Sequence, residues 1–553
     1  MENKRASIGM VIRASLINGV EMKLHAAYSS EQMKAGRFLV IEGETYDFFT
    51  IISDIRHATT NPQTLENPPD FTNDLVRLSL LGTTVFTIVS LKCMLIYDKV
   101  RKVLEPPKTI PTHFSQVAEA GENDIEIVFG NEGMNGHGEN KYFMIGTPLD
   151  MSHGVCLDLA RFVERSSAVF GRTGTGKTFI TRLLLAGFIK TRAAVNLVFD
   201  MHNEYGTSGT SEARGGSVKG LQPLFAASGL LKVYSLDPDN TRARGSHCDK
   251  ALTLFSNDIE PEDILLLQEE LRLNPTAAEY SNILKQNFKD NWLSSFLSLM
   301  KAGDESIKQF CMDNRLLVGS LDALYRRLNK LADFKFIDFE PDKRKIIPIK
   351  ELISDLQKGT SVVVEFGRYD NMTAYLLVAN VITRQIEREY KEKTEVYLSS
   401  KKEVDKPKQL VITIEEAHKF LNPRSASQTS FGKIARELRK YFVSLLIVDQ
   451  RPSSIDDEIL SQIGTKIVAA LSDDKDINAV LSGVSQAGGM KSILASLDPK
   501  QQALILGHGT PMPVVVRTRD YDDKFYTAMG ESKEIKSLGV MNDREIKTKF
   551  FPS

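Results

Sequence analysis

The feature that most constrains this chain is the run Gly-Arg-Thr-Gly-Thr-Gly-Lys-Thr at residues 171–178. It matches the pattern G-x-x-x-x-G-K-[ST] at every fixed position, and it lies between an apolar strand at 167–170 and a helix expected over 179–190. Glycines allow successive backbone N–H groups to turn toward one point, where the positive end of the helix dipole also acts. The run therefore predicts a cradle for nucleotide phosphates in a protein of the α/β class.

The side chains of this run have predictable roles. Lys177 is expected to reach the β- and γ-phosphates, and the Thr178 hydroxyl is expected to ligate Mg²⁺. The expected cofactors are thus ATP and Mg²⁺. The residues expected to bind the nucleotide along this run are Gly171, Thr173, Gly174, Thr175, Gly176, Lys177, Thr178 and Phe179.

Hydrolysis also requires acids at the ends of strands beside the cradle. The apolar run 410–414 is followed by Glu415 and Glu416. Adjacent side chains on a strand diverge, so the two carboxylates are expected to do different jobs. We assign Glu415 to the Mg²⁺ shell and Glu416 to orienting or deprotonating the attacking water. The alternative is an acid-rich helix start.

Two other strand ends carry polar candidates. Asp200 follows the apolar run 194–199, and Glu204 lies just beyond it. These acids either hold Mg²⁺-bound water and position the nucleotide, or they cap a turn. Gln450 follows the run 444–449, where a side chain that senses the γ-phosphate is expected; the alternative is an ordinary polar residue at a strand end.

A short basic helix is expected over residues 433–441. Arg436 and Arg439 lie three residues apart on it, so they share a face. A guanidinium that reached the γ-phosphate of a neighbouring subunit would stabilise the transition state and make hydrolysis depend on assembly. The alternative is a solvated basic helix.

The remaining sequence divides into regions that differ in composition and in hydrophobic pattern. Short β-rich runs near the N-terminus, among them 38–43, 84–91 and 125–128, predict a small barrel or sandwich, with 61–70 as a loop. Leucines stepping by three and four from Leu317 to Leu331 predict helices inserted into the core; the alternative is that they are ordinary peripheral helices. The expected domains are a β-rich domain over 1–150, the first part of the core over 151–245, a helical insertion over 246–345, the second part of the core over 346–520, ending in a hairpin at the sheet edge, and a polar tail over 521–553.

Charge narrows the function classes. Lys plus Arg (70) nearly cancels Asp plus Glu (71), leaving a net charge of −1, which excludes a protein that holds nucleic acid by bulk positive charge. Any binding of nucleic acid must then use local patches of positive charge. The lysine-dense segment 390–408 is either a nucleic-acid contact or a solvated loop, and 206–220, with Arg214 and Lys219, either lines a channel or is a surface loop.

Cysteine usage and hydropathy point to a cytoplasmic protein. The four cysteines lie far apart with no C-x-x-C pair, which argues against a disulfide scaffold or a zinc ribbon. The most apolar stretch, 78–91, is punctuated by polar residues and falls short of the ~20 residues that span a bilayer. No membrane contact is expected.

Taken together, these motifs resemble the HerA branch of the HerA/FtsK superfamily of hexameric DNA translocases. The segments that carry the resemblance are GRTGTGKT at 171–178, DMHNEYG at 200–206, IEEAHKFL at 414–421, ARELRKY at 435–441 and VDQRPSSID at 448–456. The β-rich N-terminus looks like the family's HAS-barrel. The resemblance implies a RecA-like P-loop NTPase core with a helical insertion, and a bacterial member of the family.

The resemblance also implies roles for single residues. Lys177 and Thr178 carry over as phosphate and Mg²⁺ ligands, Glu415 and Glu416 as the Walker B pair, Gln450 as the sensor, and Arg439 as the arginine that acts on a neighbouring subunit. In this chain Leu438 and Phe442 replace the two glycines of the family's R-E-G-R-K-[YF]-G pattern. Arg165, just before the first core strand, is also expected to face a nucleotide.

The function implied by the resemblance is that of an ATP-driven ring, a homohexamer, which translocates on double-stranded DNA. Its relatives act with a partner, either a NurA-like nuclease in DNA end processing or, in antiviral defence, a nuclease or a sirtuin-like NAD hydrolase. The alternative is an ATP-regulated ring scaffold that activates a bound effector enzyme with little translocation. A P-loop kinase or a secretion ATPase is a weaker interpretation.

Overall fold

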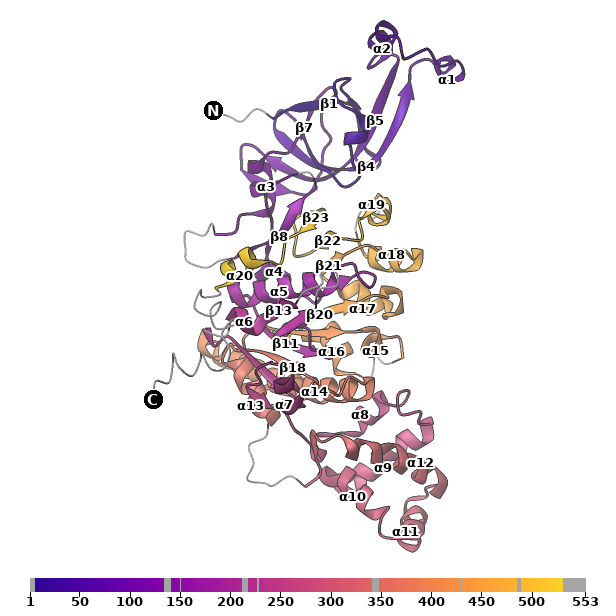
Figure 1. Ribbon diagram of the computed structural model, residues 1–553, viewed down its shortest axis with the longest axis vertical. Helices are drawn as coiled ribbons and strands as arrows, with labels where there is room; N and C mark the ends of the chain where they lie inside the picture. Colours follow the sequence, from indigo (N-terminus) through magenta and orange to yellow (C-terminus); the bar gives the residue numbers. More distant parts are fainter. Residues whose placement is uncertain are drawn as a thin grey trace.

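The computed structural model describes residues 5–133, 141–149, 151–210, 217–225, 228–340, 348–424, 426, 429–484 and 489–530. These parts form an elongated molecule with a barrel at one end, an α/β core in the middle and a helical module at the other end (Figure 1). None of the described helices is both long enough and apolar enough to cross a membrane.

The N-terminal part is a closed antiparallel barrel, as the β-rich runs predict. Its strands lie in the order β2-β1-β7-β3-β4-β5, and pairing of β2 with β5 closes the ring and removes exposed edges. The strands are β1 (Ser7–Ser15), β2 (Gly19–Leu24), β3 (Phe38–Glu42), β4 (Tyr46–Thr59), β5 (Val85–Asp98) and β7 (Gln116–Glu119), with β6 (Val103–Glu105) added beyond β5.

Two expectations for this region are wrong. Residues 125–128, predicted as a strand, lie in helix α3 (Glu122–Phe129), because Asp124 accepts the N–H of Gly121 at its start and apolar side chains three and four apart face the core. The segment 61–70 is not wholly a loop, since it contains the single turn α1 (Gln63–Glu66). Together with α2 (Asp74–Leu80), α1 lies at the tip of an arm formed by β4 and β5 (Figure 1).

The core is a twelve-stranded sheet that runs parallel through its centre. Parallel strands that are buried on both faces consist of near-continuous apolar residues, which is why these runs are recognisable in the sequence. The order is β15 (Lys250–Ala251), β14 (Leu231–Ser235), β18 (Ser361–Glu365), β11 (Val195–Asp200), β19 (Leu410–Glu415), β20 (Val443–Asp449), β10 (Ser167–Phe170), β21 (Thr465–Val468), β22 (Gln502–Gly507), β23 (Val514–Thr518), β8 (Tyr142–Pro148) and β9 (Val155–Asp158), antiparallel from β22 onward.

The edge of the core sheet and the boundaries of the core along the chain differ from those predicted. The hairpin β22–β23 forms, but it is not at the sheet edge, because β8 and β9 extend the sheet beyond it. Strand β8 thus belongs to the core sheet although it precedes residue 150. The polar tail expected from 521 begins instead with a docked helix, α20 (Asp523–Met529), whose Phe525 and Met529 are buried; residues 531–553 lie outside the described part.

Helices connect the core strands and cover the sheet. They are α4 (Leu159–Val163), α5 (Lys177–Thr191), α6 (Leu221–Phe225), α7 (Pro238–Ala243), α13 (Pro348–Gln357), α14 (Met372–Ser400), α15 (His418–Leu421), α16 (Ser430–Glu437), α17 (Asp457–Gln462), α18 (Asp474–Leu481) and α19 (Met490–Ser496). The lysine-dense segment predicted as a loop from 390 continues α14 as far as Ser400. Tyr390 and Thr394 are buried there, and Lys391 pairs with Glu387 one turn away.

The helical insertion packs around the single tryptophan, Trp292, whose Nε1 donates a hydrogen bond to the carbonyl of Ile259. Its helices are α8 (Pro261–Leu266), α9 (Pro275–Phe288), α10 (Trp292–Leu299), α11 (Asp304–Asn314) and α12 (Val318–Leu328). The leucine stripe is buried from Leu321 onward, whereas Leu317 is exposed. The chain leaves and re-enters the core through the short pair β16 (Leu254–Phe255) and β17 (Ile337–Asp338).

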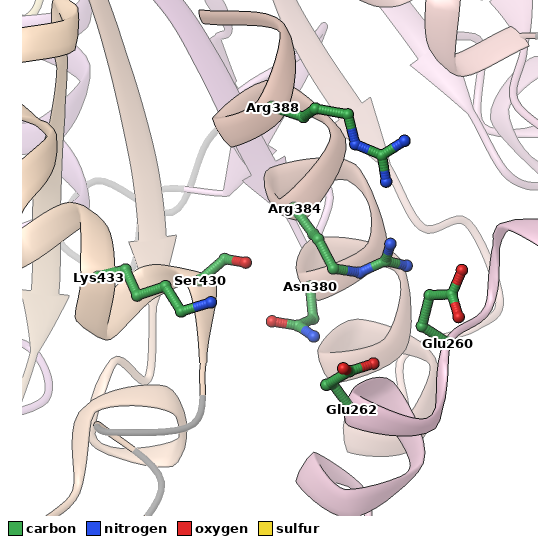
Figure 2. Close-up of a pocket in the computed structure, with 7 residues that line it drawn as sticks. All are labelled: Glu260, Glu262, Asn380, Arg384, Arg388, Ser430 and Lys433. Carbon is green, nitrogen blue, oxygen red and sulfur yellow. The ribbon is translucent and has the colours of Figure 1, made fainter. Parts of the chain in front are cut away.

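A buried acid joins the insertion to the core. Asp263 of α8 is fully buried; it accepts hydrogen bonds from Asn380 Nδ2 at 2.6 Å and Arg384 Nη2 at 2.9 Å, both on α14. Beside this contact lies a cavity of about 250 Å³ between α8, α14 and α16 (Figure 2). It is lined by Glu260, Glu262, Asn380, Arg384, Arg388, Ser430 and Lys433, none of which belongs to the predicted nucleotide site.

The first prediction concerns this joint. Asp263→Ala removes the buried carboxylate partner of Arg384, whose guanidinium keeps only the carbonyl of Asp258 among the described residues, and breaking a buried ion pair costs about 3–5 kcal/mol. Urea unfolding followed by the fluorescence of Trp292 should show that loss. The control Asp322→Ala removes a surface ion pair with Arg326 on α12 and should cost at most about 1 kcal/mol. Equal midpoints for the two variants would contradict the prediction.

Candidate functional site

The phosphate cradle has the geometry that its sequence predicts. It follows β10, and Gly174 and Gly176 adopt positive φ angles of 78° and 92°, which favour glycine. A Cβ at Gly171 would lie 2.6 Å from Thr175 Oγ1 and 2.9 Å from Ala469 Cβ, so the loop closes tightly on itself and on the residue that follows β21. Thr175 Oγ1 fixes the turn by donating to the carbonyl of Arg172 at 2.7 Å.

Helix α5 presents free backbone donors to this loop. Its first intrahelical bond runs from Ile180 N to Gly176 O, so the N–H groups of Lys177, Thr178 and Phe179 have no acceptor in the helix. The ring of Phe179 packs against Tyr521 and the Arg182 guanidinium, which leaves its backbone N–H as its contribution to the cradle. Lys177 Nζ donates to Arg172 O at 3.0 Å, and burial lowers its pKa against the opposing pull of nearby carboxylates, Glu416 foremost.

Glu415, at the end of β19, is held by two tyrosines. The hydroxyl of Tyr205 donates to its Oε1 at 2.7 Å, while the hydroxyl of Tyr375 accepts from its backbone N–H at 3.0 Å and donates to its carbonyl at 3.1 Å. Its other oxygen, Oε2, is buried and has no partner within the described residues. Burial raises the pKa of Glu415 to about 8.

Glu416 and Gln450 come together beside the cradle. Glu416 has a positive φ of 47°, which separates the direction of its side chain from that of Glu415. Gln450 Nε2 lies 3.4 Å from Glu416 Oε1, and Gln450 Oε1 accepts from Thr173 Oγ1 at 2.8 Å. The amide of Gln450 therefore bridges the cradle and the second acid.

The buried Asp449 is a residue that sequence reasoning missed. It accepts hydrogen bonds from His418 N at 2.7 Å, His418 Nδ1 at 3.0 Å and Arg451 N at 2.7 Å. The hydrogen bond to Asp449 raises the pKa of His418, and the contacts with His418 and Arg451 lower the pKa of Asp449 despite its burial. The pair orients the segment that follows Glu416.

Two expected nucleotide ligands do not face the cradle of their own chain. Asp200 is fully buried, and its carboxylate accepts the N–H groups of Glu204, Tyr205 and Gly206 at 2.7, 2.7 and 3.1 Å, which is the turn-capping alternative. Burial and the nearby Glu365 raise the pKa of Asp200 to about 7. Arg165 precedes β10, whereas the cradle follows it, and its side chain packs along Gly464 at the opposite edge of the sheet.

The two arginines of the basic helix differ in their surroundings. Arg436 is on α16 and is held by Glu458 at 2.9 Å and Asp456 at 3.4 Å. Arg439 lies in the 3-10 turn that follows, Leu438–Tyr441; it is exposed, and its side chain has no hydrogen-bond or ion-pair partner within the described parts. Arg439 is therefore the one of the pair that is available to another molecule.

The predicted channel loop is described only in part. Strands β12 (Ser208–Thr210) and β13 (Ser217–Lys219) pair as a hairpin, and Arg214 lies outside the described residues. The ammonium of Lys219 lies over the ring of Tyr526, 5.1 Å from its centre.

These donors fit a magnesium–nucleotide complex. The described residues contain no group of three or more His, Cys, Asp or Glu side chains that could hold a metal ion. The unpartnered Oε2 of Glu415 and the Thr178 hydroxyl are oxygens of the kind Mg²⁺ prefers. The free N–H groups of α5 suit phosphate oxygens.

The second prediction tests the cradle. Gly171→Ala places a methyl group against Thr175 and Ala469, so it should weaken ATP binding by at least about tenfold while the protein stays folded. Isothermal titration with a non-hydrolysable ATP analogue measures the change. The control is Gly319→Ala on α12, where a Cβ meets nothing within 4 Å, and its nucleotide affinity should match that of the unaltered chain.

The chain is similar to several known proteins. Residues 143–386 match the family described as "Helicase HerA, central domain". The DNA double-strand break repair helicase HerA of Saccharolobus solfataricus is 24% identical, with 91% of this chain and 92% of that protein aligned. The HerA of Pyrococcus furiosus is 22% identical, with 75% of each chain aligned. The solved structure of VirB4 of Thermoanaerobacter pseudethanolicus has a TM-score of 0.42 at 13% identity, covering 71% of this chain and 100% of that one. With its cradle and acids in place, this chain is a P-loop ATPase whose central part is similar to the HerA helicases.

Proposed function

We propose that this chain is an ATP-driven translocase that encircles double-stranded DNA as a homo-oligomeric ring, a hexamer by analogy with the family that it resembles. The observation that carries the proposal is the meeting of the cradle, the acid pair Glu415–Glu416 and Gln450 at one edge of the sheet. The curated relatives are named DNA double-strand break repair helicases, which supports DNA as the substrate.

Each residue of the site has a task in this proposal. Lys177 and the N–H groups of α5 bind the β- and γ-phosphates, while Thr178 and Glu415 hold Mg²⁺. The ion neutralises phosphate charge when it is bound. Glu416 orients the attacking water and takes its proton, and Gln450 connects the state of the γ-phosphate to the cradle through Thr173.

The exposed side chain of Arg439 is the reason for proposing a ring. An exposed guanidinium without a partner in its own chain is suited to the γ-phosphate of a neighbour, where it would stabilise charge in the transition state. Arg165, which packs along Gly464 and does not face the cradle of its own chain, is the second candidate for such a contact with a neighbour. Hydrolysis would then require assembly.

We further propose that the barrel docks an effector enzyme, a NurA-like nuclease or a defence enzyme such as a sirtuin-like NAD hydrolase. The arm of the barrel exposes large apolar side chains, Leu65, Leu75 and Leu78, which suits a protein contact. Triplex displacement distinguishes a ring that moves DNA from a ring that only activates the effector.

The third prediction tests the motor. The unaltered chain should displace a triplex-forming strand from long duplex DNA in the presence of ATP, and Lys177→Ala should abolish this activity and ATP hydrolysis. Lys190→Ala, at the exposed end of the same helix, is the matched control and should be fully active. Activation of a bound effector without any triplex displacement by the unaltered chain would favour the scaffold function instead.

The fourth prediction tests hydrolysis between subunits. Arg439→Ala should lower ATP turnover by about 10³-fold, as for other arginine fingers, while Lys440→Ala should leave it near normal. Mixed rings of Arg439→Ala and Lys177→Ala subunits should regain part of the activity, because some interfaces then combine an intact cradle with an intact arginine. Full turnover by a monomer, with mass checked by light scattering, would refute the shared site.

A further inference from the structure

The carboxyl group of Glu415 is held on one side only. Its Oε1 receives the Tyr205 hydroxyl at 2.7 Å, and its Oε2 is buried with no partner among the residues that the structure describes. The contacts of Tyr375 are to the backbone of Glu415 and leave the carboxyl free to rotate about its side-chain bonds. Tyr205 is therefore the described residue whose hydrogen bond selects which oxygen is free.

Tyr205 is itself fixed from several sides. It is fully buried; its N–H donates to Asp200 Oδ2 at 2.7 Å, and its carbonyl accepts the N–H of Leu221 at 2.8 Å. The Arg182 guanidinium lies 5.9 Å from the centre of its ring. The phenol therefore has little freedom to follow a moving carboxyl group, and it acts as a fixed donor.

Arg182 ties this donor to the helix of the cradle. Its Nε and Nη2 donate to the carbonyl of Glu204, at 3.2 and 2.7 Å, in the residue just before Tyr205. Arg182 is one turn beyond Thr178 on α5, so the two share a face of the helix. Arg182 as a whole is only 1% exposed, and the carbonyl it binds belongs to the backbone and does not rotate as a side chain does.

A continuous path thus joins the two residues assigned to the metal ion. It runs from Thr178 along one turn of α5 to Arg182, then through Glu204 and Tyr205 to Oε1 of Glu415. We propose that Tyr205 is a positioning residue of the metal–nucleotide site, which directs Oε2 of Glu415 toward the ion that Thr178 also binds, and that Arg182 keeps it in register with α5. This inference rests on the proposed function, which makes Glu415 and Thr178 ligands of Mg²⁺.

The test measures metal binding and not turnover. Mn²⁺ replaces Mg²⁺, and electron paramagnetic resonance of the full chain with a non-hydrolysable ATP analogue gives the Kd of the ion. Tyr205→Phe keeps the ring and removes the hydroxyl, and loss of such an outer hydrogen bond weakens metal binding about 10–100-fold. Affinity for the same analogue in EDTA should not change. An unchanged Mn²⁺ affinity would overturn the inference.

The matched control is Tyr390→Phe. Tyr390 is also fully buried, and its hydroxyl has no partner within the described residues, so its removal should leave Mn²⁺ binding unchanged. A loss of Mn²⁺ affinity in this variant equal to that of Tyr205→Phe would mean that any buried phenol matters, and it would overturn the inference.

A double variant separates positioning from general disruption. If Tyr205 acts through Glu415, then Tyr205→Phe should not weaken Mn²⁺ further in a Glu415→Ala background. A further tenfold loss there would overturn the inference. Should Tyr205→Phe fail to fold, Arg182→Lys tests the same path, because lysine cannot make both hydrogen bonds to Glu204 and should weaken Mn²⁺ several-fold; unchanged affinity would again overturn it.

Failure of the proposed function would be visible separately. It would appear as no nucleotide-dependent Mn²⁺ binding by the unaltered chain, or as normal binding by Glu415→Ala. Failure of the inference alone would leave both of these measurements as expected, and only the Tyr205 and Arg182 variants would behave like the unaltered chain.

Discussion

Parallel pairing of β10 with β20, and of β20 with β19, is the constraint on which the site depends. The register places Phe170 beside Asp449 and Glu415 beside Val448, so residues more than 200 positions apart in the chain end at the same edge. Strand β10 pairs with both β20 and β21, and β20 pairs with both β10 and β19, so each strand is held in register from two sides. The distance between the cradle and the acids is therefore set by the sheet and not by the loops.

This edge concentrates buried acids, and each is compensated differently. Asp200 has three backbone donors, and Glu365 has the Arg244 guanidinium at 2.9 Å. Glu415 has one neutral phenol on its carboxyl group. A buried carboxylate without a cation is costly, so Glu415 has the most to gain from a positive ion. The raised pKa of Glu415 has the same cause.

Sequence reasoning found the parts of the site that are encoded locally. The cradle, the strand that ends in Glu415 and the position of Gln450 each follow from a few consecutive residues, and the barrel follows from repeated β-rich runs. Tyr205 was visible in the segment 200–206 but carried no role, because its contact with Glu415 spans 210 positions. Asp449 could not be predicted for the same reason. In the sequence it is only the last residue of a strand, and its contact with His418 appears only in the structure.

The errors also have physical causes. The run 125–128 is rich in β-branched residues, which suit a strand, but Asp124 caps the helix and the core takes up its apolar face. The lysine-dense continuation of α14 is typical of a loop in its composition, because most of its residues are charged. It is a helix because one face carries residues that are buried, among them Tyr390 and Thr394. The segment from 521 is predicted as a polar tail because Lys, Asp and Glu occur throughout it, but the rings of Tyr521 and Phe525 pack against each other with their centres 4.9 Å apart.

The way the helical insertion is attached has a further consequence. Its two ends meet in the two-residue pair β16–β17, so the flanking core segments are separated by a fixed gap whatever lies between them. A module mounted in this way can be lengthened, shortened or exchanged during evolution without changing the spacing of the core strands. It is nevertheless not isolated, because Glu270 forms an ion pair with Lys419, three residues beyond Glu416, at 3.2 Å. The outermost and most replaceable part of the subunit thus has a direct electrostatic contact with the segment that carries the second acid.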